Sequence, residues 1–189
     1  MKILLSLILM MIFVQSFAQT IAAKSTVVHM YKTDTIVVTL PKTQNTKIPK
    51  IWKNKKSIQK EWIHIEKDFK GYLNYDPCDG EAEQIYITEN YIRIEWAMEE
   101  PEKFKILKFN FANGSRIFTF TAINKEYRNQ IQGSAQILDS EKGVVLWEIN
   151  GFRWLTVPIA NIDQYRKIEN ICVNNKVVEL EFLPIQNYK

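Results

Sequence analysis

Short segments in which apolar and polar residues alternate dominate this chain. Segment 61–66 is the clearest: Trp62, His64 and Glu66 point to one side, and Ile63 and Ile65 to the other. A period of two is typical of a strand with one buried face. About ten such segments recur at roughly ten-residue intervals, a spacing typical of all-β sandwiches and barrels.

Two local signals refine this pattern in the middle of the chain. Asn113-Gly114 is a strong hairpin signal between segments 104–111 and 116–123. Within 104–111 the apolar residues change phase, from Phe104 and Ile106 to Leu107, Phe109 and Phe111. We therefore predict a β-bulge that restores a single buried face.

The connections determine which all-β architecture we expect. Short turns between consecutive strands favour an antiparallel up-and-down meander, which hides its edges by closing. We predict a lipocalin-like barrel with one short helix near 160–168, capped by Asn161. A β-sandwich with Greek-key crossings is the alternative. The architecture resembles that of lipocalin-type proteins, but the Gly-x-Trp of their first strand is absent: Glu61-Trp62 lacks the glycine.

Residues 1–19 have the layout of a secretory signal peptide. Lys2 precedes an apolar run at 3–14, and Ser16-Phe17-Ala18 offers a small-x-small cleavage site. The run is shorter than the roughly 20 residues that span a bilayer. We expect cleavage after Ala18 or Gln19, export to the periplasm or the medium, and no membrane span in the mature chain.

Residues 20–60 form an N-terminal region that precedes the main β domain at 61–189. It begins with a predicted hairpin of strands 26–31 and 35–40 and continues into the lysine segment, residues 42–60, which holds seven lysines and no acid. Such a run is either a solvated connection or a basic patch for an anionic polymer or protein. The residues predicted for the patch are Lys50, Lys53, Lys55, Lys56 and Lys60. The net charge of +4 is too small to imply a nucleic-acid partner.

The chain has two cysteines, Cys78 and Cys172. Disulfides persist in exported proteins, and two cysteines without CxxC spacing favour one structural bridge over a metal or redox site. We predict a Cys78–Cys172 disulfide. The alternative is two buried thiols that pack as small apolar side chains.

Residues that carry chemistry are scarce. His29 and His64 are the two histidines, and no nucleotide fingerprint or phosphate-binding loop is present. A satisfied strand histidine is the simpler interpretation of His64. The acidic turn at 76–83 offers oxygen ligands for calcium, but its spacing is not that of an EF-hand. We expect a protein that is not an enzyme and needs neither metal nor cofactor.

Aromatic residues on the strands are the remaining functional signal. They either form an ordinary core or line an apolar cavity of the kind that binds small molecules. The residues predicted to line a cavity are Trp62, His64, Tyr86, Trp96, Phe118, Phe120 and Trp147. We predict an exported binding protein whose barrel holds a small apolar or amphipathic ligand. The alternative is an interaction module that binds a protein or a cell-envelope polymer through residues 42–60.

Overall fold

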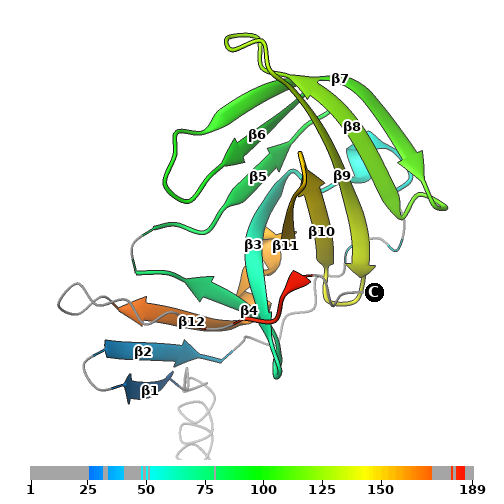
Figure 1. Cartoon of the computed structure of the whole chain (residues 1–189). Coiled ribbons are helices and arrows are strands. Elements are labelled where there is room, and N and C mark those ends of the chain that lie inside the picture. The colour runs from blue at the N-terminus through cyan, green and yellow to red at the C-terminus, as the bar shows by residue number, and fades with distance from the viewer. Residues whose placement is uncertain are drawn as a thin grey trace, which may run out of the picture.

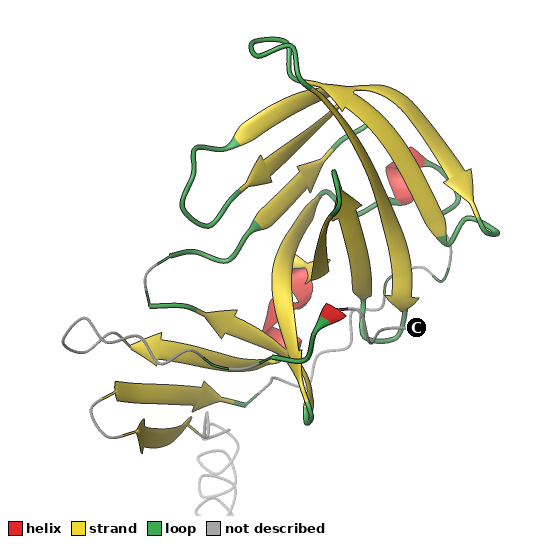
Figure 2. Cartoon of the chain, in the orientation of Figure 1, coloured by secondary structure: helices red, strands yellow, loops and turns green. Residues whose placement is uncertain are grey.

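The fold is nearly all-β, as predicted (Figures 1 and 2). The computed structural model describes residues 26–31, 34–40, 48, 50, 52–78, 80–171, 180 and 182–185. The strands are β1 (Thr26–Tyr31), β2 (Asp34–Thr39), β3 (Glu61–Asp68), β4 (Gly71–Asp76), β5 (Gln84–Ile87), β6 (Tyr91–Glu95), β7 (Glu102–Ala112), β8 (Ile117–Ile123), β9 (Gln130–Asp139), β10 (Val144–Ile149), β11 (Phe152–Pro158) and β12 (Arg166–Ile171). In the described part of the chain, no helix has the length and apolar character needed to cross a membrane.

Eight of these strands close into an antiparallel barrel. Strands β5 to β11 run as a meander in which each strand pairs with the next. Strand β3 closes the ring because it pairs with both β11 and β5, with Trp62 opposite Pro158 on one side and Ile85 on the other. The predicted up-and-down barrel is therefore confirmed, and the sandwich alternative is not adopted.

The second half of β3 starts a side sheet outside the barrel (Figure 1). Glu66 pairs with Leu73 of β4, and the order then runs β4–β12–β2–β1. The pairing of β12 with β4 is the one parallel contact among the described strands. Two ion pairs join the side sheet: Arg166 to Asp68 at 2.6 Å and Lys167 to Asp76 at 2.7 Å. The predicted N-terminal hairpin is present as β1 and β2, and it lies beside β12.

Local geometry at the β7–β8 hairpin follows the two sequence signals. Asn113 and Gly114 adopt left-handed φ angles of 48° and 59°, and the amide of Arg116 donates to the carbonyl of Asn113. The register of β7 against β8 shifts between Ile106 and Lys108. The predicted bulge is thus confirmed, and it returns Phe109 and Phe111 to the inner face. Leu107, which was predicted to share that face, lies at the register shift and is 56% exposed.

The predicted helix near 160–168 is present as a short 3-10 helix, η2 (Ile159–Gln164). Its bounds differ from the prediction, because the chain is already extended at Arg166, where β12 begins. Pro158 is the N-cap, whereas Asn161 lies inside the helix and is buried. The second helical element is a single 3-10 turn, η1 (Lys55–Ser57), within the lysine segment.

The core has two main parts, separated by the barrel wall. Side chains from all around the barrel fill its interior. A second cluster lies outside the wall, where Val144, Leu146 and Leu155 pack with Ile65 and Tyr165. Strand β10 is consequently buried on both faces, because Trp147 and its inward neighbours serve the interior while Val144 and Leu146 serve the outer cluster. This double burial explains why 144–147 is a continuous apolar run.

Candidate functional site

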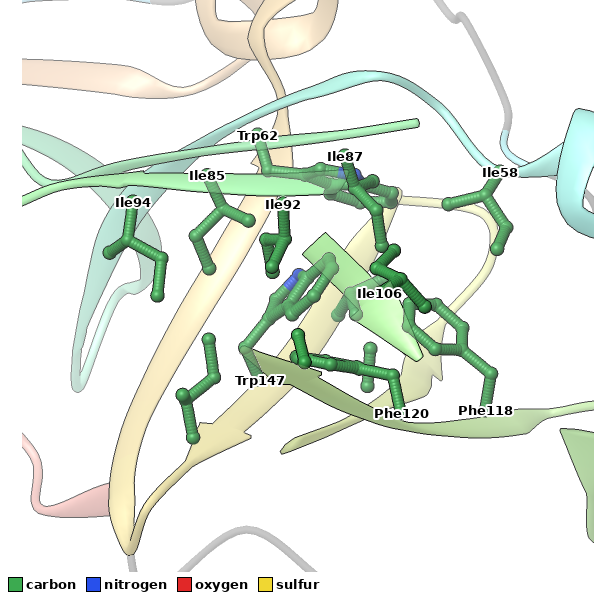
Figure 3. Packing of buried hydrophobic residues seen from close by; sticks show 14 of the residues in the cluster. Ile58, Trp62, Ile85, Ile87, Ile92, Ile94, Ile106, Phe118, Phe120 and Trp147 are labelled. Carbon is green, nitrogen blue, oxygen red and sulfur yellow. The ribbon is translucent and has the colours of Figure 1, made fainter. Parts of the chain in front are cut away.

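Four residues predicted to line a cavity meet in the barrel interior. Trp62, Phe118, Phe120 and Trp147 are each at most 3% exposed. Their rings contact one another: Trp147 lies 5.3 Å from Phe118, 6.0 Å from Trp62 and 6.3 Å from Phe120, centroid to centroid. Figure 3 shows these rings surrounded by isoleucines of β5, β6 and β7. The side chains therefore occupy much of the space that the prediction assigned to a ligand.

The other three predicted residues are not among these central rings, although Trp96 packs against the same interior cluster. Tyr86 stacks on Tyr91 at 5.8 Å, on the opposite face of β5 from the buried Ile85. Trp96 follows β6 and packs against Trp154 and Phe152 of β11, with centroid distances of 5.3 and 6.3 Å. Phe152 is 63% exposed, so this aromatic cluster reaches the surface at one end of the barrel.

His64 lies between two carboxylates where β3 leaves the barrel. Its Nδ1 lies 2.7 Å from Oε2 of Glu83, and its Nε2 lies 3.4 Å from Oε1 of Glu66. The alternation of β3 places His64 and Glu66 on one face, and the backbone bond from the His64 amide to the Glu83 carbonyl brings in Glu83. The expectation of a satisfied, partly buried histidine agrees with this geometry, since 18% of the side chain is exposed.

The electrostatics of this cluster favour a charged imidazole. Burial alone would lower the pKa of His64, but the hydrogen bond to Glu83 and the charges of Glu66 and Glu83 outweigh burial and raise the pKa. Burial likewise opposes ionisation of Glu83, yet the bond to His64 lowers the pKa of this carboxyl. The pKa of Glu66 is raised, chiefly by burial. Because two carboxylates hold the imidazole, one at each ring nitrogen, we call these three residues the His64 clamp.

The acidic side chains of the turn at 76–83 have different surroundings. Glu81 and Glu83 line a pocket of about 200 Å³ beside His64 and Tyr75, whereas Asp76 is ion-paired with Lys167. Asp79 lies outside the described residues. Among the residues that the structure describes, no His, Cys, Asp and Glu side chains form a group of three that could hold a metal ion.

The described end of the lysine segment is fixed to the barrel. Ile48, Trp52 and Ile58 are buried in the interior cluster, and the Trp52 amide donates to the Ser115 carbonyl at 2.9 Å. The Trp52 ring meets Phe118 edge-on at 4.8 Å. Between these anchors, η1 is closed by a capping box in which Asn54 and Ser57 exchange hydrogen bonds.

Anchoring leaves the predicted basic patch at the surface. The members of this patch are all exposed: Lys50, Lys53, Lys55, Lys56 and Lys60. No carboxylate lies within ion-pair distance of any of them in the described part of the chain. Lys55 lies over the ring of Phe109, with its Nζ 5.1 Å from the centroid.

Cys78 follows β4, and Cys172 lies outside the described residues, so their bond stays a prediction. The parallel register supports it, because Asp76 of β4 is opposite Glu169 of β12. Cys78 therefore comes two residues after this paired position, and Cys172 comes three residues after it.

The sequence analysis did not identify Glu83 as the partner of His64 Nδ1. The β3–β5 register brings Glu83 to His64, and no local motif indicates this pairing.

Comparison of this chain with protein-family models, curated proteins and solved structures gave no match.

Proposed function

We propose that this chain is an exported, non-enzymatic binding protein that uses its basic patch to bind an anionic cell-envelope polymer or protein surface. One observation carries the proposal: five exposed lysines without ion-pair partners among the described residues lie on a segment anchored by Trp52 and Ile58. An unpaired cationic surface attracts polyanions and raises their association rate. The export step is the prediction made from residues 1–19.

Anchoring favours binding over a purely connecting role for this segment. A flexible run of lysines loses conformational freedom when it meets a partner, and this loss reduces affinity. Here the backbone from 52 to 58 is already held by buried side chains and a capped turn. The loss of backbone conformational entropy in this segment therefore occurs largely on folding, and little of it is left to reduce the affinity for a partner.

A charge-reversal experiment tests the proposal. The triple variant Lys53→Glu, Lys55→Glu, Lys56→Glu should lose retention on a heparin column. The parent should be retained, and it should elute earlier when the salt concentration of the buffer is raised. The matched control reverses Lys103, Lys105 and Lys125, which are also exposed but lie around a groove beside β6 and β7. Equal elution of the two triple variants, or no retention of the parent, would contradict the proposal.

A second candidate is a small apolar or amphipathic ligand, favoured by the aromatic cluster of Trp96, Phe152 and Trp154. Its rings lie within 6.3 Å of one another, and Phe152 is largely exposed. Small-molecule sites are lined mainly by apolar and aromatic side chains, and this cluster presents such side chains near the surface. Native mass spectrometry of the purified protein should detect a carried ligand that Phe152→Ala loses. A ligand-free protein whose tryptophan emission does not respond to 1-anilinonaphthalene-8-sulfonate would remove this candidate.

A further inference from the structure

A polar groove crosses the outer face of the barrel. It has a volume of about 570 Å³ and spans four neighbouring strands, from β7 to β10. Its lining is dominated by amide and hydroxyl side chains: Asn110, Thr119, Thr121, Gln130, Gln132, Ser134 and Asn150. Phe118 and Phe120 alternate with the threonines and point inward, so the threonines lie on the outer face. Phe120 also borders the groove, because its partner Gly133 has no side chain to cover it.

The strand register arranges these side chains in two rows. One row runs Asn110–Thr119–Ser134–Glu148, since each residue is the registered partner of the next. A parallel row runs Lys108–Thr121–Gln132. At the usual strand spacing, a row from β7 to β10 is about 14 Å long. The groove therefore suits an elongated ligand that lies across the strands.

The hydrogen-bonding groups of the groove are available to a ligand. Among the described residues, the side chains of Asn110, Thr119, Thr121 and Gln132 have no hydrogen-bond partner. Asn150 differs, because its Oδ1 accepts a hydrogen bond from the backbone N–H of Gln132. This bond holds the β10–β11 turn against β9. The Asn150 contact thus fixes one part of the groove, and the other four side chains offer free donors and acceptors.

Charge and polarity narrow the chemistry of the ligand. Glu148 faces Arg153, whose Nε lies 3.7 Å away, and Lys108 stands at the other side of the groove. The floor between them is neutral. An apolar ligand would bury the polar side chains of the groove without giving them hydrogen-bond partners, which costs about 1–3 kcal/mol for each group. A hydroxyl-rich ligand both donates and accepts, as amides and hydroxyls do.

We propose that this groove is a binding site for a neutral polysaccharide chain. The site is distinct from the basic patch, because it shares no residue with the patch and would bind through hydrogen bonds in place of charge. A protein with both surfaces can hold a neutral glycan and an anionic partner at the same time.

Titration with three defined probes tests the proposal: cellohexaose, maltohexaose and chitohexaose, followed by amide NMR on the full mature chain. At least one probe should cause saturable shifts confined to β7–β10 and the 150–151 turn, with a Kd in the millimolar range or tighter. Saturable shifts elsewhere, or none with any probe, would overturn it.

A matched pair of variants on one strand sharpens the result. Gln132→Ala removes an amide from the groove, whereas Gln136→Ala makes the same change four residues along the same face of β9, outside the groove. Gln132→Ala, alone or with Thr121→Val, should weaken binding about tenfold, and Gln136→Ala should leave it unchanged. Equal affinities of the two glutamine variants would overturn the proposal. The charge-reversal variant of Lys53, Lys55 and Lys56 should still bind the glycan. A negative result with the glycans would therefore contradict the groove proposal alone, and a negative result with heparin would contradict the basic-patch proposal alone.

Discussion

At the scale of single residues, side-chain size is matched across neighbouring strands of the barrel. Phe118 and Phe120 of β8 are the registered partners of Ala135 and Gly133 of β9. Large rings can enter the interior because small residues stand opposite them. A Cβ built on Gly133 would lie 2.6 Å from Cε1 of Phe120 and 3.1 Å from the Glu148 carbonyl.

Gly133→Ala should therefore destabilise the barrel. Phe120 is 3% exposed and packed against Trp147, so its ring has little room to move. Overpacking of this kind costs about 1–3 kcal/mol, measured as the loss in free energy of unfolding by denaturant titration. Ser134→Ala, at the next position on the outer face, should change the value by less than about 0.5 kcal/mol. Equal losses in the two variants would show that the ring does not limit this position.

The His64 clamp predicts a pH-dependent contribution to stability. A histidine whose pKa is raised on folding stabilises the fold fully below its ordinary value of about 6.5. That contribution is lost as the pH rises through the raised value. The pKa of Glu83 is lowered, so its contribution is present above its ordinary value and is lost as the pH falls through the lowered one. The pair is therefore most stabilising at mildly acidic pH.

NMR titration of the His64 ring checks the sign of this effect. Its midpoint should lie above 6.5 in the parent and should move down in Glu83→Gln, which keeps the shape of the side chain but removes its charge. His64→Gln should flatten the decline in unfolding free energy at pH values just above 6.5. A parent midpoint at or below 6.5 would refute the clamp.

At the scale of elements, the lysine segment is held by the barrel interior. Trp52 is 1% exposed and packs on Phe118, which is itself fully buried. The segment thus contributes to the core as well as to the surface. Its charged residues are exposed because the positions between them, Trp52 and Ile58, are buried.

Trp52→Ala should release the segment. We expect a loss of about 3–5 kcal/mol in unfolding free energy, the range for removing a buried tryptophan. Tryptic cleavage after Lys53 and Lys56 should also accelerate, measured by mass spectrometry at early times. Lys55→Ala is the control, because an exposed cation–π contact contributes only about 0.5–1 kcal/mol. Cleavage of the Trp52 variant at the parental rate would mean that the anchor does not hold the segment.

At the scale of the whole molecule, β3 joins two sheets. Its first half closes the barrel, and its second half pairs with β4 and so begins the side sheet. The side sheet depends on β12, which reaches β4 from the far end of the chain. A bond between Cys78 and Cys172 would link the ends of these two parallel strands.

We predict that this disulfide stabilises the side sheet. Denatured but unreduced protein should not react with iodoacetamide, and it should react at two sites after reduction. Cys78→Ala with Cys172→Ala should lower the unfolding free energy by about 4–5 kcal/mol in the chain-entropy model. Hydrogen exchange should rise in β4 and β12 more than in β7 and β8. Two reactive thiols in the unreduced protein would contradict the bond.

Much of the fold was predictable because strand formation and turn formation are local. The alternation of β3, the Asn113-Gly114 turn and the bulge near Ile106 each follow from residues within one segment. The end of η2 was predicted too far along the chain, because β12 joins β2 and β4 and this pairing overrides the helical spacing of 160–168. The partner of His64 was not predictable, since Glu83 reaches it only through the β3–β5 register.

The sequence alone determined that the chain forms an amphipathic β-meander, because burial of alternate side chains requires only the period of each strand. Only the tertiary structure decided which faces meet. Closure by β3 turned Trp62, Phe118, Phe120 and Trp147 into a packed core, and it left a row of amides and hydroxyls on the outside of β7–β10. The physical reason is that a strand's pattern specifies which residues share a face, whereas pairing and closure specify what each face contacts.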